Sequence, residues 1–233
     1  MSHGNMKSMY EMLMEIPLFK GVSRQNISQA IEQTKFHFLR YSEGETVVAS
    51  GDECSHIRIV ISGSVRVTVA DASGAFEVSQ TLSAPDVIAP DFLFGRATSY
   101  PCSVVALGDV GVIEISKQDY VAILGMDSVY LLNFLNMLSM NAQKAVDGAM
   151  AASRGAVAER IAFQIAALTQ SGGTDVMMRS CGCELCELFG VSDDELRVVL
   201  EEMRLCGVLD YDSCRIWVHS RREIVSMLSS AAD

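Results

Sequence analysis

The hydrophobic pattern of the chain changes its period twice along its length. Apolar residues recur at helical spacing in residues 9–35. From residue 36 to 116, short segments rich in Val and Ile, such as "IRIVIS" and "SVRVTVAD", are separated by turn sequences such as "SEGE" and "DASGA". Many short strands with Gly-containing turns predict a sandwich or barrel of the jelly-roll kind, also called a double-stranded β-helix.

A long helix is predicted after these strands, in the segment "DSVYLLNFLNMLSMNAQKAVDGAMAAS". Alternating spacings of four and three residues form a heptad seam, which consists of Leu131, Leu135, Leu138, Ala142, Ala145 and Ala149. The remaining face also carries apolar residues, namely Phe134, Met137, Met140 and Val146. Because the helix is apolar on two faces, we expect it to lie between its own jelly roll and a second copy of the chain. The alternative is a helix that packs only on its own subunit.

The C-terminal third predicts a helix-turn-helix followed by a β-hairpin, which together make a winged helix. The expected elements are a helix that ends at Gly172 and Gly173, a strand in "TDVMMRS", helices over residues 182–189 and 193–206, a hairpin in "VLDYDSCRIWVHS" and a short helix from Arg221. The predicted fold class is therefore α+β. Its expected domains are a sensing jelly roll at 1–125, a dimerisation helix at 126–152 and a winged helix at 153–233.

The composition fits an ordinary globular protein, with 49% hydrophobic and 20% charged residues. The N-terminus has no cationic stretch followed by an apolar one, and no run of about 18 apolar residues occurs anywhere. We therefore expect a cytoplasmic protein without a membrane partner. The net charge of −11 argues against non-specific binding to nucleic acid or to an anionic membrane.

The seven cysteines include a cluster, "CGCELC", in which Cys183 and Cys186 have the CxxC spacing of zinc ligands. A tetrahedral zinc site needs a second ligand pair, and Cys206, Cys214 and His219 lack paired spacing. We therefore predict no metal site, and interpret the cysteines mainly as small buried hydrophobic residues.

Five fragments in order connect the chain to a known family. They are "IPLFKGVS", "VISGSVRV", "FLF" at 92–94, "RIA" at 160–162 and "LCELFGVSDDELRVVLEEMRLCGVL". Over nearly its whole length the chain resembles the CRP/FNR family of bacterial transcription regulators. The resemblance implies a cyclic-nucleotide-binding-type jelly roll, a homodimer formed through the long helix, and binding of double-stranded DNA by the winged helix. It also makes RNA polymerase a candidate partner.

The resemblance fails where family members bind cyclic AMP. Those members carry Gly-Glu and, about ten residues later, Arg-Ser, whereas this chain has Ala89-Pro90 and Tyr100-Pro101 at these places. The hydroxyls that contact the base from the long helix are replaced by Ala145 and Val146. We therefore predict that cyclic AMP does not bind. The predicted effector pocket consists of Ala89, Pro90, Asp91, Arg96, Tyr100, Asn141 and Ala145.

The cofactor stays open. The iron–sulfur branch of the family needs N-terminal cysteines, and none precedes Cys54. Heme would need an axial ligand, for which His37, His56 or a Met of the long helix are candidates, although a lone His near a strand is more often structural. A metal-dependent enzyme of the cupin type would need clustered His and carboxylate ligands, which His37 and His56 do not provide. We therefore predict that the chain is not an enzyme.

The predicted DNA-reading helix is acidic at its start. Residues 153–233 contain eight Arg and 13 Asp or Glu, a net charge of −5. Asp193, Asp194 and Val198 stand where the family carries its base-reading Arg, Glu and second Arg, and Arg197 is displaced by one position. At the N-terminal turns of this helix, the candidate DNA-contacting residues are Ser192, Asp193, Asp194 and Arg197. The candidate phosphate-binding residues are Arg179, Arg204, Arg215, Arg221 and Arg222.

Two alternatives to this DNA-reading interpretation remain. Asp193, Asp194 and Glu195 can simply stabilise the N-terminus of the helix through its dipole, which we favour for Glu195. The acidic helix also suits a surface that contacts protein instead of DNA.

Overall fold

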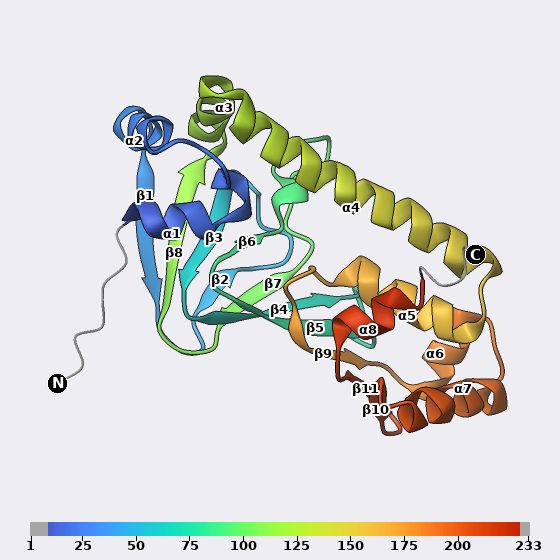
Figure 1. Cartoon of the computed structure of the whole chain (residues 1–233). Helices are drawn as coiled ribbons and strands as arrows, with labels where there is room; N and C mark the ends of the chain where they lie inside the picture. The colour runs from blue at the N-terminus through green and yellow to red at the C-terminus, as the bar shows by residue number, and fades with distance from the viewer. Residues whose placement is uncertain (1–8, 229–233) are drawn as a thin grey trace. The chain divides into compact units, whose positions relative to one another are not determined.

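The computed structural model describes residues 9–228, apart from the side chains of residues 9, 144, 147, 148 and 151–154. The chain divides into two compact units, whose elements are labelled in Figure 1. The described part of the first unit comprises residues 9–65, 83–101 and 105–140, and that of the second comprises residues 66–82, 102–104 and 141–228. The domain boundaries at residues 125 and 152 stay predictions.

The first unit begins with three short helices where one helical segment was predicted. They are α1 (Met9–Glu15), the 3-10 helix η1 (Pro17–Phe19) and α2 (Arg24–Gln33). Pro17 interrupts the helix because it lacks an N–H group and holds the preceding Ile16 in an extended conformation. Ser23 then starts α2 as its N-cap, since its hydroxyl accepts a hydrogen bond from the Asn26 N–H at 3.2 Å.

One sheet of the first unit contains four antiparallel strands in the order β1-β8-β3-β6. Their bounds are Phe36–Tyr41, Val110–Ser116, His56–Ser62 and Asp86–Ile88. Isoleucines at alternating positions of β3 and β8 are buried, with Ile57 opposite Ile115 and Ile59 opposite Ile113. This alternation is the pattern that predicted a jelly roll, and it places one face of the sheet in the core. The three-residue strand β6 was not predicted, because it lies directly between turn sequences.

The other predicted strands of residues 36–116 are also present. They are β2 (Thr46–Val48), β4 (Ser64–Ala70), β5 (Glu77–Ser83) and β7 (Ser103–Ala106). The predicted α+β class is therefore confirmed.

The long helix is present as α4 (Ser128–Arg154), with 27 residues, and follows α3 (Lys117–Met126). Asp127 separates the two helices with an extended backbone, and its carboxylate accepts hydrogen bonds from the Val129 N–H and from the Asn26 side chain. Two aromatic residues anchor the start of α4, since Tyr130 packs on Phe19 and Phe134 packs on Tyr120 and Phe94, each with ring centroids 5.5–5.6 Å apart.

The two apolar faces predicted for α4 are only partly found. Phe134 is buried, but Met140 and Val146 are 55% and 63% exposed, so the second face ends after the first turns of the helix. The heptad seam is largely exposed, with Leu131 at 41% and Leu135 at 45%. Its alanines 142, 145 and 149 are also exposed, whereas Leu138 is half-buried. The chain alone therefore leaves an apolar seam uncovered, and the homodimer stays a prediction.

The second unit contains the predicted winged helix. Its helices are α5 (Val157–Leu168), α6 (Gly182–Phe189), α7 (Asp193–Leu205) and α8 (Arg221–Ser226), and its strands are β9 (Thr174–Arg179), β10 (Leu209–Tyr211) and β11 (Arg215–Val218). Helix α5 ends before the predicted glycines, because Thr169 turns to an extended backbone and its hydroxyl binds the Ile165 carbonyl. We call the buried cluster between these elements the winged-helix core, and it includes Val78, Ile161, Ile165, Met178, Leu196, Leu200, Met203, Ile216 and Ile224.

The sheet of the second unit was predicted only in part. The hairpin β10–β11 and the strand β9 are antiparallel neighbours, as in a winged helix. Strand β5, which precedes β9 by almost 100 residues in the sequence, pairs with the other edge of β9. Strand pairing between distant segments carries no local sequence signal, and this contact was therefore not predicted.

Candidate DNA interface and effector pocket

In the helix-turn-helix, specific capping residues define the end of α6 and the start of α7. Gly190 ends α6 in the left-handed region, with φ of 63°, a conformation that glycine adopts without strain. Ser192 starts α7 with a capping box: its hydroxyl accepts from the Glu195 N–H at 3.3 Å, and the Glu195 carboxylate accepts from the Ser192 N–H at 3.0 Å. The Ser192 N–H foremost, and then the Ser192 hydroxyl, which donates to the Glu195 carboxylate at 2.8 Å, lower the pKa of Glu195. Glu195 thus stabilises the helix N-terminus, as predicted.

Helix α7 has one buried and one exposed side. Leu196, Leu200 and Met203 lie in the winged-helix core. The side chains of Asp193 and Arg197 are 63% and 71% exposed and form an i,i+4 ion pair at 3.3 Å. Such exposed pairs contribute little to stability, so breaking this pair costs little free energy.

Most of the other predicted phosphate contacts also have acidic partners. Arg204 donates two hydrogen bonds to Glu201, at 2.9 and 2.7 Å, and its pKa is raised by them. The predicted contacts Arg179 and Arg215 lie 2.7 Å from Glu77 and 3.8 Å from Asp212. Arg215 also lies over the ring of Trp217, with its guanidinium carbon 5.6 Å from the centroid. Arg222 is exposed and forms no ion pair within residues 9–228.

Arg221 differs from its neighbour Arg222 because its guanidinium is used inside the protein. It donates hydrogen bonds to the Thr169 hydroxyl at 2.7 Å, the Thr169 carbonyl at 2.8 Å and the Ala166 carbonyl at 3.3 Å. Burial lowers its pKa. The prediction that Arg221 contacts phosphate therefore needs correction, since in this structure the side chain joins α8 to the end of α5.

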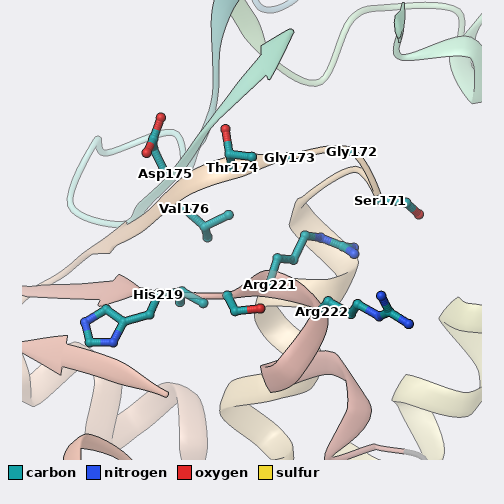
Figure 2. Close-up of a pocket in the computed structure, with 11 residues that line it drawn as sticks. Ser171, Gly172, Gly173, Thr174, Asp175, Val176, His219, Arg221 and Arg222 are labelled. Atoms are coloured by element: carbon teal, nitrogen blue, oxygen red, sulfur yellow. The ribbon is translucent and has the colours of Figure 1, made fainter. Parts of the chain in front are cut away.

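A pocket with a volume of about 340 Å³ lies next to Arg221, between the α5–β9 turn and the start of α8. Figure 2 shows its walls, with Gly172, Gly173 and Thr174 on one side and His219, Arg221 and Arg222 on the other. The hydroxyl of Ser220 caps the N-terminus of α8, and Arg221 is hydrogen-bonded to Thr169 at the end of α5. Asp175 and the exposed Arg222 also line this pocket.

His219, at the edge of this pocket, faces two hydrogen-bond acceptors. Its Nδ1 lies 2.9 Å from the Gly207 carbonyl and its Nε2 lies 2.9 Å from the Asp210 carboxylate. Both ring nitrogens can donate only in the imidazolium form, so the backbone hydrogen bond first, and Asp210 second, raise the pKa of His219.

The raised pKa of His219 predicts a pH-dependent stability of the wing. Because the folded pKa lies above the unfolded value of 6.5, the stabilisation is complete below about pH 6.5 and is lost as the pH rises through the folded pKa. We expect His219→Gln to lower the midpoint of thermal unfolding more at pH 6 than at pH 9. A His37→Gln variant, changed on the exposed strand β1, is the control and should show no such difference. Equal losses at both pH values for His219→Gln would contradict the prediction.

The loop that resembles a phosphate-binding cassette has a constrained backbone. Ala89 occupies the place of the family's glycine and has φ of 41° and ψ of 52°, a left-handed conformation that is uncommon for a residue with a Cβ. It is followed by the buried Pro90 in the 3-10 helix η2 (Pro90–Phe92). The side chains of Asp91 and Arg96 are exposed.

Tyr100 stands at the sequence position that the resemblance assigns to the family's phosphate-binding Arg. It is 1% exposed, and its hydroxyl donates to the His56 carbonyl at 3.0 Å. Burial raises the pKa of Tyr100, which keeps the phenol neutral. Four of the predicted pocket residues lie with Tyr100 in the first unit, whereas Asn141 and Ala145 belong to the second, so their place in the pocket stays a prediction.

Arg58 and Glu114 form an ion pair beside Tyr100 that the sequence analysis did not single out. They lie opposite each other on β3 and β8, with side chains 19% and 14% exposed. The Arg58 guanidinium lies 5.4 Å from the centroid of the Tyr100 ring. A signal was present, since one Arg and one Glu interrupt the apolar segments "HIRIVIS" and "VGVIEIS".

The described cysteine and histidine residues form no metal centre. Within residues 9–228 no three His, Cys, Asp or Glu side chains are arranged to hold a metal ion. His37 is exposed, and His56 Nδ1 is hydrogen-bonded to the Ser55 hydroxyl at 2.9 Å. Cys54 and Cys102 are buried as predicted, but the five cysteines of the winged helix are not: Cys181, Cys183, Cys206 and Cys214 are exposed, and Cys186 is half-buried. The prediction of buried cysteines is therefore wrong there, because these residues lie at helix ends, on the outer side of α6 and in turns.

Among the described residues, no single helix has the length and apolar character to span a membrane. The bent pair Lys117–Met126 and Ser128–Gln143 meets both criteria together, by length and composition only, across a 118° bend.

Comparison with known proteins agrees with this architecture. Residues 38–127 match the family described as cyclic nucleotide-binding domain, whereas no curated protein sequence matches the chain. The crystal structure of the Thermus thermophilus catabolite activator protein aligns with 91% of this chain and 99% of its own, at 22% identity and a TM-score of 0.51. The sensor domain of the transcriptional regulator DNR from Pseudomonas aeruginosa aligns with 58% of this chain and 89% of its own, at 18% identity and a TM-score of 0.51. Residues 38–127 are therefore similar to the cyclic nucleotide-binding domain, and the chain has the fold of the catabolite activator protein, as the resemblance to the CRP/FNR transcription regulators implied.

Proposed function

We propose that the chain is an effector-responsive transcription regulator that binds operator DNA as a homodimer. The observation that carries the proposal is the arrangement of α7. Its apolar side is fixed in the winged-helix core, while its first turns, with Ser192, Asp193, Asp194 and Arg197, are exposed. A helix held in this way can enter the major groove with its N-terminal residues at the base edges.

The charge of α7 implies an operator unlike one read by an Arg-Glu pair. Asp193 or Asp194 can accept a hydrogen bond from a cytosine amino group, and Arg197 can donate two to guanine. Because the phosphate contacts are few and mostly paired with carboxylates, non-specific affinity is expected to be weak and its salt dependence shallow. Specific recognition then depends on few groups.

Selection from genomic DNA tests this function. Purified protein is titrated against genomic fragments and the bound pool is sequenced. We expect enrichment of a palindromic site, with half-sites about one helical turn apart, because a two-fold homodimer presents two copies of α7. A bound pool without any enriched sequence would contradict DNA recognition.

The effector is not cyclic AMP in this proposal. Pro90 removes a backbone donor at the place of the family's glutamate, and the buried Tyr100 replaces the cation that would balance the cyclic phosphate. Calorimetry with cyclic AMP should therefore show no binding in the micromolar range. The variant Tyr100→Phe should behave alike, since the hydroxyl donates to the His56 carbonyl and supplies no cation for a phosphate. A micromolar dissociation constant for either protein would refute the prediction.

A second function is favoured by a specific observation on α7. Its carboxylates outnumber its arginines by five to two, and Val198 and Leu205 are 58% and 73% exposed. An acidic helix with exposed apolar residues also suits a protein partner. In this alternative the helix-turn-helix contacts protein instead of DNA. RNA polymerase stays a candidate partner of the DNA-binding regulator, as the resemblance implied.

Other parts of the prediction belong to the same proposal. We propose a cytoplasmic location, no catalytic activity and no membrane partner. Heme stays a candidate cofactor, with His37 or His56 as ligands, in a variant of the proposal in which the chain is a gas sensor of the same family. Spectra of the chain reconstituted with heme, compared with those of the His37→Ala and His56→Ala variants, test this directly.

A further inference from the structure

Strand β5 is part of the sheet of the winged helix in this structure. Strand β5 pairs antiparallel with β9, with Glu77 opposite Arg179, Val78 opposite Met178 and Ser79 opposite Met177. Because Met178 also lies opposite Ile216 on β11, one row of side chains crosses three strands. Val78 is 1% exposed and belongs to the winged-helix core.

Two polar contacts reinforce this strand pairing. The carboxylate of Glu77 lies 2.7 Å from the guanidinium of Arg179, which is one of the predicted phosphate contacts. The side-chain carbonyl of Gln80 accepts a hydrogen bond from the Gln170 N–H at 2.9 Å. A Cβ at Gly173 would lie 2.0 Å from the same Gln80 oxygen, so the turn after α5 fits around this side chain.

Several features show that the pairing is not built for maximum stability. Ser79, Gln80 and Thr81 are 3%, 2% and 7% exposed, which is unusual for three consecutive polar residues. The hydroxyls of Ser79 and Thr81 are buried without a hydrogen-bond partner within residues 9–228. A buried hydroxyl without a hydrogen-bond partner has lost its hydration without compensation, which destabilises this strand.

The backbone of the pairing is also irregular. The register shifts between Ser79 and Thr81, and Asp175 on β9 has φ of 46°, in the left-handed region. A bulge and a strained residue weaken the end of the ladder. A strand with apolar support on one side and unsatisfied polar groups on the other is suited to two states, paired and released.

We propose that the β5–β9 pairing is a releasable latch that controls the DNA contact of Arg179. Closed, the latch pairs the half-exposed Arg179 with Glu77; open, it removes this carboxylate, and the guanidinium can bind phosphate. The effect on DNA rests on the proposed DNA-binding function, whereas the latch itself does not. Because opening of the latch frees Arg179 for a phosphate, it strengthens DNA binding.

Hydrogen–deuterium exchange of the full-length chain tests the latch without DNA. The amides of residues 77–81 and 174–179 should exchange together, because one opening event exposes both strands. Glu77→Gln removes the ion pair and should raise both rates by about two- to fivefold. Val78→Thr conserves the shape of the side chain but places a hydroxyl in the winged-helix core, and should raise both rates by about tenfold.

The control is Asp109→Asn, which makes the same charge change as Glu77→Gln at an exposed turn of the first unit. It should leave both segments unchanged. Exchange of β5 without exchange of β9 would overturn the latch. So would exchange rates of these two segments that are the same in Glu77→Gln, Val78→Thr and Asp109→Asn.

DNA titrations then test its consequence. Glu77→Gln should bind the selected operator several-fold more tightly, with a salt slope about one unit steeper, because one more phosphate is neutralised. The double variant Glu77→Gln/Arg179→Gln should lose this gain. An unchanged affinity and slope in Glu77→Gln would overturn the control of DNA binding. If no variant binds DNA at all, the proposed function fails, and the exchange rates still decide the latch.

Discussion

Leu135→Asp is expected to convert the homodimer into monomers. Leu135 is the second residue of the heptad seam of α4. It is 45% exposed in the single chain, so its replacement should leave the fold of the subunit intact. At a two-fold seam the substitution places two carboxylates close together in an apolar contact, and the effective penalty is several kcal/mol per buried ion. The dimer dissociation constant should therefore rise by a factor of a thousand or more, on the order of 4 kcal/mol.

Sedimentation of wild-type and variant chains measures this change. Leu107→Asp is the matched control, because Leu107 is 42% exposed and lies between β7 and β8 of the first unit. It should sediment as the wild type does. A wild-type monomer, or a Leu135→Asp chain that remains dimeric, would show that the seam on α4 is not the dimer contact.

Arg197→Ala is expected to relax the sequence preference for DNA. Arg197 lies four residues after Asp193 on the exposed side of α7, one turn from the N-terminus, and its side chain is 71% exposed. Loss of an arginine that reads guanine typically costs about 1–3 kcal/mol for the preferred base pair and little for other sequences. The measurement is binding to the selected site and to each single base-pair variant of it.

Two further variants separate base reading from charge. Arg197→Lys keeps the positive charge but loses the forked donor geometry, and should show nearly the same loss as Arg197→Ala. Arg222→Ala removes an exposed cation and should weaken binding to all sequences alike, with a salt slope lower by about one unit. Equal small losses on every duplex for Arg197→Ala would favour the protein-contact alternative for α7.

The local elements of this chain could be predicted from its sequence because their signals are local. Alternation in "IRIVIS" and turn glycines identify strands, and Ser192 with Glu195 identifies the start of α7. Pro17 divides a helical segment by its missing N–H, a signal that was present but underestimated. The β5–β9 pairing joins residues about 100 positions apart, and only its polar, buried strand hints at it.

The site residues were harder to predict than the fold. The sequence shows that Arg221 follows the predicted hairpin. Only the structure shows that Thr169 and Ala166 accept its hydrogen bonds. Likewise, the substitution of the family's Arg by Tyr100 is visible in the sequence, whereas the buried hydroxyl on the His56 carbonyl is not. Residue type alone favoured burial of the cysteines. Those of the winged helix are exposed or half-buried because they lie at helix ends and in turns.

The most direct test of DNA recognition is the ratio of affinities for the selected operator and for a scrambled duplex of the same composition, measured at physiological salt. Specific regulators exceed their own non-specific affinity by about 10³-fold or more. We expect a ratio of at least this size, because the acidic α7 and its paired arginines should make the scrambled duplex a poor ligand. A ratio near one would contradict sequence-specific binding and leave α7 as a protein-contact surface.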